Sequence, residues 1–452
     1  MPTAGMQAFW QAPGSASALR LARAEGIYVW DDHGRRYFDV TSGPVAVNLG
    51  HGNPRVLAAM REQAARAAFA YPSQLESEAN LRFTARLCAA AGPGFDHAFV
   101  VSGGSEAVEK CLQFARVHAL ATKQPGRWKI IGRLPAYHGS TLGALEVAGD
   151  MGSGVMAPYL HDMPRVPAPL TYRLPDGHDV VSFARHCLAE LETTIAREGA
   201  DTVLAFLLEP VIGLSGGAVS APAFYYDEVR RICSRHGILL IYDEIITGAG
   251  RTGRFLAAHH WPDARPDLVV LAKGIGGGYW PLGAFLAPAV MVEAVASGPG
   301  FHYGHTHKGS PLGCAVGLAV LEETLDRDLP ANAERVGARL RDRLRALQPT
   351  LPLLGDVRGI GLLNAIEIVA DPVTKTMLPR EFPVIEDLKA LALTEGLLIY
   401  GRRSYAGRYG DWLMMTPPLI ATESDIDALV DGVARTLRTY ADRLAREGRL
   451  RG

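Results

Sequence analysis

The sequence carries almost no excess charge. Its 452 residues include 46 Lys and Arg against 47 Asp and Glu, a formal net charge of -1, which gives no general attraction to nucleic acid or to an anionic membrane. The arginine-rich end at 435–451 interleaves Leu, Ala and acidic residues, a pattern typical of a solvated amphipathic helix rather than a nucleic-acid patch. We therefore expect no nucleic-acid partner.

Long hydrophobic runs, targeting signals and cysteines are also scarce. No uncharged apolar run reaches the ~18 residues that a transmembrane helix requires, and Met1-Pro2-Thr3-Ala4-Gly5 lacks the basic and apolar regions of a signal peptide. The five cysteines are unevenly spaced: Cys88, Cys111, Cys187, Cys233 and Cys314. These features predict a cytoplasmic protein with reduced thiols, without a membrane partner, a disulfide framework or a metal cluster.

A chain of 452 residues exceeds one ordinary hydrophobic core, so we expect a large domain and a smaller one. Residues 61–330 alternate strand and helix patterns and form the expected large domain. Residues 331–452 mix helices and strands without that alternation, which is typical of a smaller α+β domain. The N-terminal segment 1–60 holds short strand signals, and we assign it to the small domain.

The alternation predicts an α/β fold, with a largely parallel sheet covered by helices on both faces. The expected strands are 98–101, 129–132, 203–208, 238–242, 268–272 and 283–286. Ligands of such sheets bind beyond the carboxyl ends of the strands. The residues that directly follow these runs are therefore the candidates for a functional site.

An acid directly follows one of these runs, and a lysine directly follows another. Asp243 follows Ile238–Tyr242, and Lys273 follows Leu268–Ala272. A lysine on a rigid strand end can be desolvated and can form a Schiff base with a carbonyl, while an acid on the neighbouring strand can keep a ring nitrogen protonated. Together they indicate a pyridoxal-phosphate enzyme.

Two glycine-containing turns follow two other strands. Ser102-Gly103-Gly104-Ser105 leads into a helix whose free amides and positive dipole end would form a phosphate cup. Tyr137-His138-Gly139 offers an aromatic ring that could stack on a flat cofactor, with His138 behind it. Taken singly, the first is also an ordinary Ser-capped turn and the second an ordinary surface aromatic.

Glu209 and Thr306 complete the candidates. Glu209 ends the apolar run 203–208 and is either a site acid or a turn acid. Thr306 lies in the loop His302-Tyr303-Gly304-His305-Thr306-His307, where its hydroxyl could reach a phosphate. The three histidines of this loop also suggest zinc, but they lack a clear carboxylate or cysteine partner, and we expect no metal.

In this arrangement the sequence closely resembles the class III aminotransferases, fold-type I pyridoxal-phosphate enzymes that include ω-amino acid and amine transaminases. The matching segments are Ser102–Ala107, Tyr137–Thr141, Glu209–Val211, Asp243–Ile245 with Gly250–Gly253, Ala272–Gly274, Gly304–Thr306 and Pro417–Leu419. The resemblance implies a large domain with a mostly parallel seven-stranded sheet between helices, a smaller α+β domain, and pyridoxal 5′-phosphate as cofactor. It also implies at least a homodimer, with a tetramer left open.

The resemblance implies a role for each candidate. Lys273 would carry the cofactor covalently and then move a proton between the substrate carbon and the cofactor. Asp243 would bond the pyridine nitrogen, with His138 nearby, and Ile245 and Tyr137 would pack on opposite faces of the ring.

The phosphate would lie against Gly104 and Ser105, and Thr306 would serve mainly the phosphate of the other subunit. Glu209 would lie near the ring oxygen or the substrate side. The implied reaction moves an amino group from a primary amine or (ω-)amino acid to a keto acid such as pyruvate by a ping-pong cycle.

Substrate and reaction type stay open at this stage. Arg402, Arg403 and Arg408 are equal candidates for binding a substrate carboxylate. Many amine transaminases have a tryptophan where this chain has Val45, which implies a roomier pocket, and Trp10 or Tyr28 could supply its wall. An aminomutase, a decarboxylating lyase or a non-catalytic binding protein on the same scaffold are the alternatives.

Overall fold

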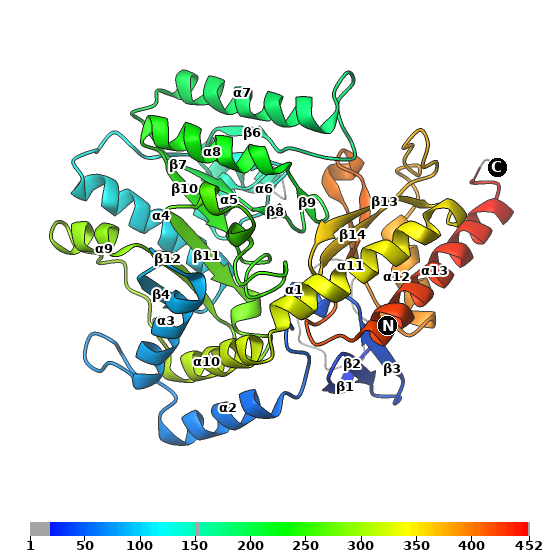
Figure 1. Cartoon of the computed structure of the whole chain (residues 1–452), viewed down its shortest axis with the longest axis horizontal. Coiled ribbons are helices and arrows are strands. Elements are labelled where there is room, and N and C mark those ends of the chain that lie inside the picture. Colours follow the sequence, from blue (N-terminus) through cyan, green and yellow to red (C-terminus); the bar gives the residue numbers. More distant parts are fainter. Residues whose placement is uncertain (1–18, 150–152, 451–452) are drawn as a thin grey trace.

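The computed structural model describes residues 19–149 and 153–450, which Figure 1 shows as a large sheet with its helices beside a smaller sheet with its own. The large sheet has seven strands in the order β4-β12-β11-β10-β7-β5-β6. All neighbours pair in parallel except β12, which is antiparallel to β11 and β4. The strands are β4 (His97–Val101), β5 (Lys129–Leu134), β6 (Arg165–Pro167), β7 (Val203–Leu208), β10 (Leu239–Asp243), β11 (Leu268–Ala272) and β12 (Gly283–Ala287).

Helices cover both faces of this sheet, and its inner strands β7, β11 and β12 are apolar throughout. In β10, Ile241 packs on the side of α4 (Gly104–Ala121), whereas Leu240 and Tyr242 pack on the side of α7 (Val180–Glu198) and α8 (Ala223–His236). Successive side chains of a strand point to opposite faces, so each strand contributes to two cores. The mostly parallel seven-stranded sheet between helices is therefore confirmed.

The C-terminal part forms a second sheet with the order β13-β14-β17-β16 and antiparallel pairing. Figure 1 shows the helices of this part beside the sheet. The elements are β13 (Leu354–Ile360), β14 (Leu363–Ile368), β16 (Tyr400–Arg403), β17 (Asp411–Met415), α11 (Leu329–Leu347), α12 (Val384–Thr394) and α13 (Glu423–Arg446). Buried residues such as Leu340, Leu413 and Leu429 give this part its own core.

The N-terminal strands join this second core. β1 (Leu21–Glu25), β2 (Tyr28–Asp31) and β3 (Arg36–Asp39) form an antiparallel ribbon, and β3 pairs in parallel with β15 (Leu397–Leu398). Ile27, Phe38 and Val40 are buried in the cluster that also holds Leu413. The first described residues therefore pack with a segment more than 300 positions later, which the sequence order alone does not reveal.

The remaining elements connect these parts or flank them. They are α1 (Ser42–Val45), α2 (Pro54–Arg66), α3 (Glu78–Ala91), α5 (Leu142–Val147), α6 (Ser153–Met156), α9 (Ala289–Ala296), α10 (Pro311–Asp326), β8 (Val211–Ile212), β9 (Val219–Ser220) and the short 3-10 turn η4 (Lys273–Ile275). Among the residues that the structure describes, no helix combines the length and apolar character needed to cross a membrane.

Candidate active site

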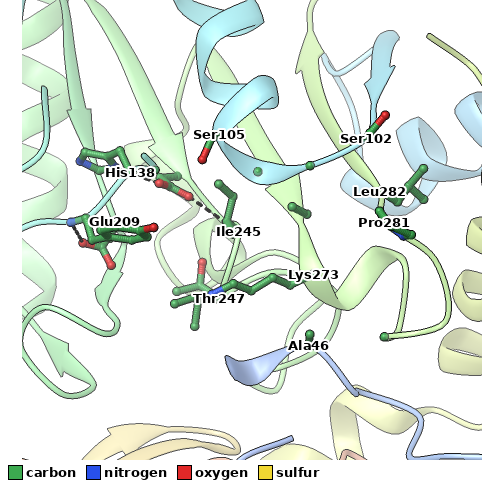
Figure 2. A pocket seen from close by; sticks show the side chains of 18 of the residues that line it. Ala46, Ser102, Ser105, His138, Glu209, Ile245, Thr247, Lys273, Pro281 and Leu282 are labelled. Atoms are coloured by element: carbon green, nitrogen blue, oxygen red, sulfur yellow. Dashed lines mark hydrogen bonds and ion pairs between the residues drawn. The ribbon is translucent and has the colours of Figure 1, made fainter. Parts of the chain in front are cut away.

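The carboxyl ends of the parallel strands meet at one cavity of about 410 Å³. Ser105 follows β4, Tyr137 and His138 follow β5, Glu209 follows β7, Asp243 ends β10, and Lys273 follows β11. All six, with Gly104 and Ile245, line this cavity. Figure 2 shows the Lys273 side chain extending from its turn, with Ser105, Ile245 and Glu209 around the same space. The structure thus brings together the residues that the sequence selected, with one exception, Thr306.

One end of the cavity is the amino end of α4. This helix of 18 residues begins at Gly104, after Gly103, and no side chain caps its first amides. Its free N–H groups and positive dipole end therefore remain available to an anion. Ser105 adds a hydroxyl, whose Oγ accepts a hydrogen bond from Ser140 N at 3.1 Å. A Cβ on Gly104 would lie 3.0 Å from Ile245 Cδ1, so glycine allows the close approach of these two segments.

Asp243 is held in place by two bonds. Its Oδ2 lies 2.8 Å from His138 Nδ1, and its Oδ1 accepts from Ile245 N at 3.0 Å. Both side chains of the Asp243–His138 pair are almost fully buried. A buried carboxylate in such a bonded frame has one defined orientation toward the cavity, which suits recognition of a protonated ring nitrogen.

Glu209 connects two loops of the site. Its Oε1 accepts from Tyr137 N at 3.0 Å, and its Oε2 accepts from Gly213 N at 2.7 Å. Burial raises the pKa of the Glu209 carboxyl above its usual value, while the charge of His138 acts in the opposite direction. Glu209 therefore fixes the backbone that carries the Tyr137 ring.

Lys273 stands in a tight turn at the end of β11. Its φ of 47° is the left-handed conformation, which is uncommon for a residue other than glycine, and Gly276 N and Gly277 N both donate to its carbonyl at 3.0 Å. Burial lowers the pKa of the Lys273 amine to about 8, and Asp243 and Glu209 only partly offset this effect. The amine is therefore far more often neutral, and so nucleophilic, than an exposed lysine.

This lowered pKa predicts how the amine reacts with an aldehyde. In cofactor-free protein, the rate of covalent attachment of pyridoxal phosphate should rise with pH and level off above a midpoint of about 8, because only the neutral amine attacks. Stopped-flow absorbance at a series of pH values measures this midpoint. A rate that keeps rising toward the ordinary lysine pKa of about 10.4 would show that the Lys273 amine is not desolvated.

Thr306 is the predicted residue that lies apart from the others. It occupies an exposed loop between α9 and α10 and does not line the cavity of its own chain. Nε2 of the neighbouring His305 lies 3.1 Å from the carboxylate Oε2 of Glu106 in α4. In the described residues no group of three or more His, Cys, Asp or Glu side chains is arranged to hold a metal ion.

The three candidate arginines have different surroundings. Arg403 forms an ion pair with Asp411 at 2.6 Å and donates to the backbone of 378–380, so it has a structural role. Arg408 is exposed and lies over the Tyr409 ring. Arg402 donates to the Tyr400 hydroxyl and is close enough to Lys273 for its charge to lower the lysine pKa. Arg402 itself lines a second cavity, with Lys389 and Tyr400, and not the cavity around Lys273.

The pocket wall differs from what the sequence led us to expect. Val45 is buried in the core, and the next residue, Ala46, lines the cavity. Tyr28 packs on Phe38 with ring centroids 5.7 Å apart and is not a wall residue. Trp10 lies outside the described residues.

Sequence reasoning missed several residues of the lining: Ala46, Val211, Ile246, Thr247, Gly278, Trp280, Pro281 and Leu282. One signal was present, because Trp280 closes the glycine run 276–278 shortly after Lys273. An aromatic residue in a glycine loop beside a reactive lysine is a candidate wall. The others are small or aliphatic, and no pattern in the sequence separates them from ordinary core residues.

Comparison with known proteins identifies the family. The aminotransferase class-III family profile matches residues 11–437, and the chain belongs to this family. It is 33% identical over 451 residues to diaminobutyrate–2-oxoglutarate transaminase of Halomonas elongata, covering 97% of this chain and 94% of the relative.

Solved structures give the same result. An (S)-enantioselective ω-transaminase from Thermomicrobium roseum has a TM-score of 0.85 and 37% identity, covering 93% of this chain and 92% of that one. A PLP-bound amine transaminase from an uncultivated Pseudomonas species has a TM-score of 0.89 and 33% identity, and the match covers 96% of this chain and 99% of that one. The protein is an aminotransferase whose cofactor is pyridoxal 5′-phosphate.

The cavity fits this cofactor. Its volume of about 410 Å³ lies within the usual range of small-ligand pockets. An anion-binding helix end, a buried carboxylate and a desolvated lysine surround the same space. These groups suit, in that order, the phosphate, the pyridine nitrogen and the aldehyde of the cofactor.

Proposed function

We propose that Lys273 carries the cofactor covalently and that the cavity around it is the catalytic centre of the aminotransferase. The observation that carries this proposal is the buried Lys273 amine, which shares its cavity with the anchored Asp243 carboxylate and the free amino end of α4. Pyridoxal phosphate, when bound, supplies an aldehyde that condenses with amines and a ring that withdraws electrons from the attached carbon.

The residues of the chain would divide the remaining tasks. Asp243, held by His138, would keep the ring nitrogen protonated, and Gly104 and Ser105 would bind the phosphate. Tyr137 and Ile245 would flank the ring, while Glu209 fixes the Tyr137 backbone. When a substrate amine replaces the Lys273 amine on the cofactor, the freed Lys273 amine would take the proton from the substrate carbon and deliver it to the cofactor carbon on the other side of the nitrogen. This role requires a neutral amine near physiological pH.

We further propose that the substrates are a primary amine or (ω-)amino acid donor and a keto acid acceptor, and that Arg402 binds a substrate carboxylate. The charge of Arg402 helps to lower the Lys273 pKa, which supports this choice. Arg403 pairs with Asp411 and donates to the backbone of 378–380. A guanidinium is suited to this task because it binds a carboxylate through two parallel hydrogen bonds.

A panel of donors tests this function. Purified protein with cofactor should lose its visible cofactor absorption when mixed with a suitable donor and regain it with a keto acid, without release of carbon dioxide. In Arg402→Gln protein, donors and acceptors with a distal carboxylate should lose affinity, while plain amines react as before. Carbon dioxide release, or a product that keeps its amino group, would instead indicate a lyase or an aminomutase.

We propose a homodimer as the minimum assembly, with Thr306 of each chain serving the phosphate of its neighbour. The exposed position of Thr306, outside the cavity of its own chain, supports this assignment. We also propose that residues 61–330 form a large domain and that 1–60 and 331–452 form a small one. We propose a cytoplasmic location as well, which is supported by the five free cysteines.

Replacing Thr306 by alanine should therefore weaken cofactor binding by ~1.5–3 kcal/mol, the range for hydrogen bonds to charged groups. Dialysis followed by absorbance measures the loss, and Lys273 stays available for reattachment. The sharper test mixes Thr306→Ala chains with Lys273→Ala chains. A shared site gives each mixed dimer one intact site, so activity returns in part. An active monomer in sedimentation, or verified mixed dimers without activity, would contradict this assembly.

A further inference from the structure

The segment after β3, which is exposed only at Gly43 and Pro44 up to Val45, reaches the active site in a strained conformation. Ser42 and Val45 have φ values of 52° and 64°, a conformation that a β-branched valine rarely adopts. Such strain persists only where the surroundings hold the backbone in place. The segment continues through Ala46, which lines the cavity, to Asn48, which is 1% exposed.

Asn48 lies directly against the turn that carries Lys273. A Cβ built on Gly274 would be only 2.4 Å from Asn48 Nδ2, so the amide occupies the space beside the residue that follows the lysine. The same Nδ2 donates to Ala249 O at 3.1 Å, and the Ala249 side chain also borders Gly274. Asn48 and Ala249 together form the wall against which the lysine turn rests.

Arg251 holds the other end of the Asn48 amide. The Arg251 guanidinium is fully buried and donates to Asn48 Oδ1 at 2.8 Å. It also donates to Pro417 O at 2.5 Å and Leu362 O at 3.3 Å, which belong to the C-terminal part of the chain. Arg251 therefore joins the lysine turn, through Asn48, to the second sheet.

We infer that Asn48, oriented by Arg251, is a positioning residue that fixes the Lys273 turn and couples it to the C-terminal sheet. This inference rests on the proposed role of Lys273. The position requires an amide because it must accept from Arg251 and donate to Ala249 in the same orientation. An aspartate could not donate to Ala249 O. An aliphatic residue would remove both the donor to Ala249 O and the acceptor that Arg251 has in Asn48 Oδ1.

The test compares Asn48→Ala with the wild-type holoenzyme. Hydrogen exchange of the peptide that contains 273–277 should become faster, because its amides close the lysine turn. The kcat should fall at least ~10-fold, as expected for a misplaced catalytic group, with little change in KM. A donor deuterated at the reacting carbon should show a larger isotope effect, since proton transfer by Lys273 then limits the rate.

Asn332→Ala is the matched control. Asn332 donates to Leu419 O and Ala421 O and thus ties α11 to the same C-terminal segment. Its replacement should change neither the exchange of 273–277 nor the isotope effect. If Asn48→Ala behaves like this control, with normal exchange and kcat, the inference is wrong.

Gly274→Ala, measured alone, keeps the inference testable if Asn48→Ala folds poorly, because normal kcat and normal exchange of 273–277 in this variant would contradict the inference. The added methyl group collides with the Asn48 amide, so Gly274→Ala alone should lower kcat, and the double variant with Asn48→Ala should recover part of it. Strictly additive effects would overturn the inference. Borohydride reduction of each variant separates the two proposals, because labelling of a lysine other than Lys273 contradicts the proposed function, not only the role of Asn48.

Discussion

Replacing Lys273 by alanine is expected to abolish transamination and to leave pyridoxal phosphate bound only noncovalently. The lysine supplies both the covalent link and the proton carrier, and no other lysine lines the cavity within the described residues. The loss should exceed that of any other single replacement, since residues that act at the reacting bond typically contribute several orders of magnitude. Single-turnover absorbance with a reactive donor measures the effect.

Lys129→Ala is the matched control for this experiment. Lys129 also lies on a strand of the large sheet, but it stands at the start of β5 and pairs with Glu198 at 3.1 Å. Its removal should leave the half-reaction near the wild-type rate. Substantial turnover in Lys273→Ala protein would mean that another amine carries the cofactor.

Replacing Asp243 by asparagine should slow the half-reaction by at least ~10²-fold, or about 2.7 kcal/mol of barrier. The change keeps the size of the side chain and can keep one bond within the His138–Ile245 frame. It removes the negative charge that stabilises a protonated ring nitrogen, so the ring withdraws electrons less strongly. The rate is measured in a single turnover, apart from product release.

Asp267→Asn provides the control for Asp243. Asp267 directly precedes β11, but it accepts from Leu240 N near the start of β10 and pairs with Arg230. Its replacement should affect folding stability more than the chemical step. A normal single-turnover rate in Asp243→Asn protein would show that another group protonates the ring nitrogen.

Much of the site was predictable because each catalytic candidate directly follows an apolar strand. Lys273, Asp243, Glu209 and Ser105 needed only the strand pattern and the rule that parallel strands present their carboxyl ends together. The residue types also suggested a Schiff-base role for Lys273, a ring-nitrogen role for Asp243 and a phosphate cup at Ser105. The role of Glu209, in contrast, came from the family resemblance, because a Glu before a proline is common in other contexts.

The contacts around these residues were not predictable in the same way. Asn48 and Arg251 meet across about 200 positions of sequence, and neither stands at the end of a strand. Arg402 and Arg403 are adjacent and chemically identical, and only the pairing of β16 with β17 assigns Asp411 to Arg403. Such choices depend on long-range register, which local patterns do not contain.

Strand β13, which was not among the strands expected from the sequence, has a similar explanation. β13 (Leu354–Ile360) contains Gly355, Asp356 and Arg358 and does not resemble a buried strand. Arg358 is nevertheless buried, because it pairs with Glu367 of β14 at 2.8 Å and donates to the carbonyls of Gly216 and Gly217. Buried charge of this kind is stable only with its partners in place, so a charged strand is recognised only once its neighbours are known.

The most direct test of the central claim is to locate the lysine that carries the cofactor. Native protein is reduced with borohydride, digested, and its pyridoxyl peptide is identified by mass spectrometry. Our account predicts a single labelled peptide, spanning the end of β11 and the glycine run that follows, with the modification on Lys273. Modification of a different lysine, or the absence of any reducible covalent link in active enzyme, would contradict it.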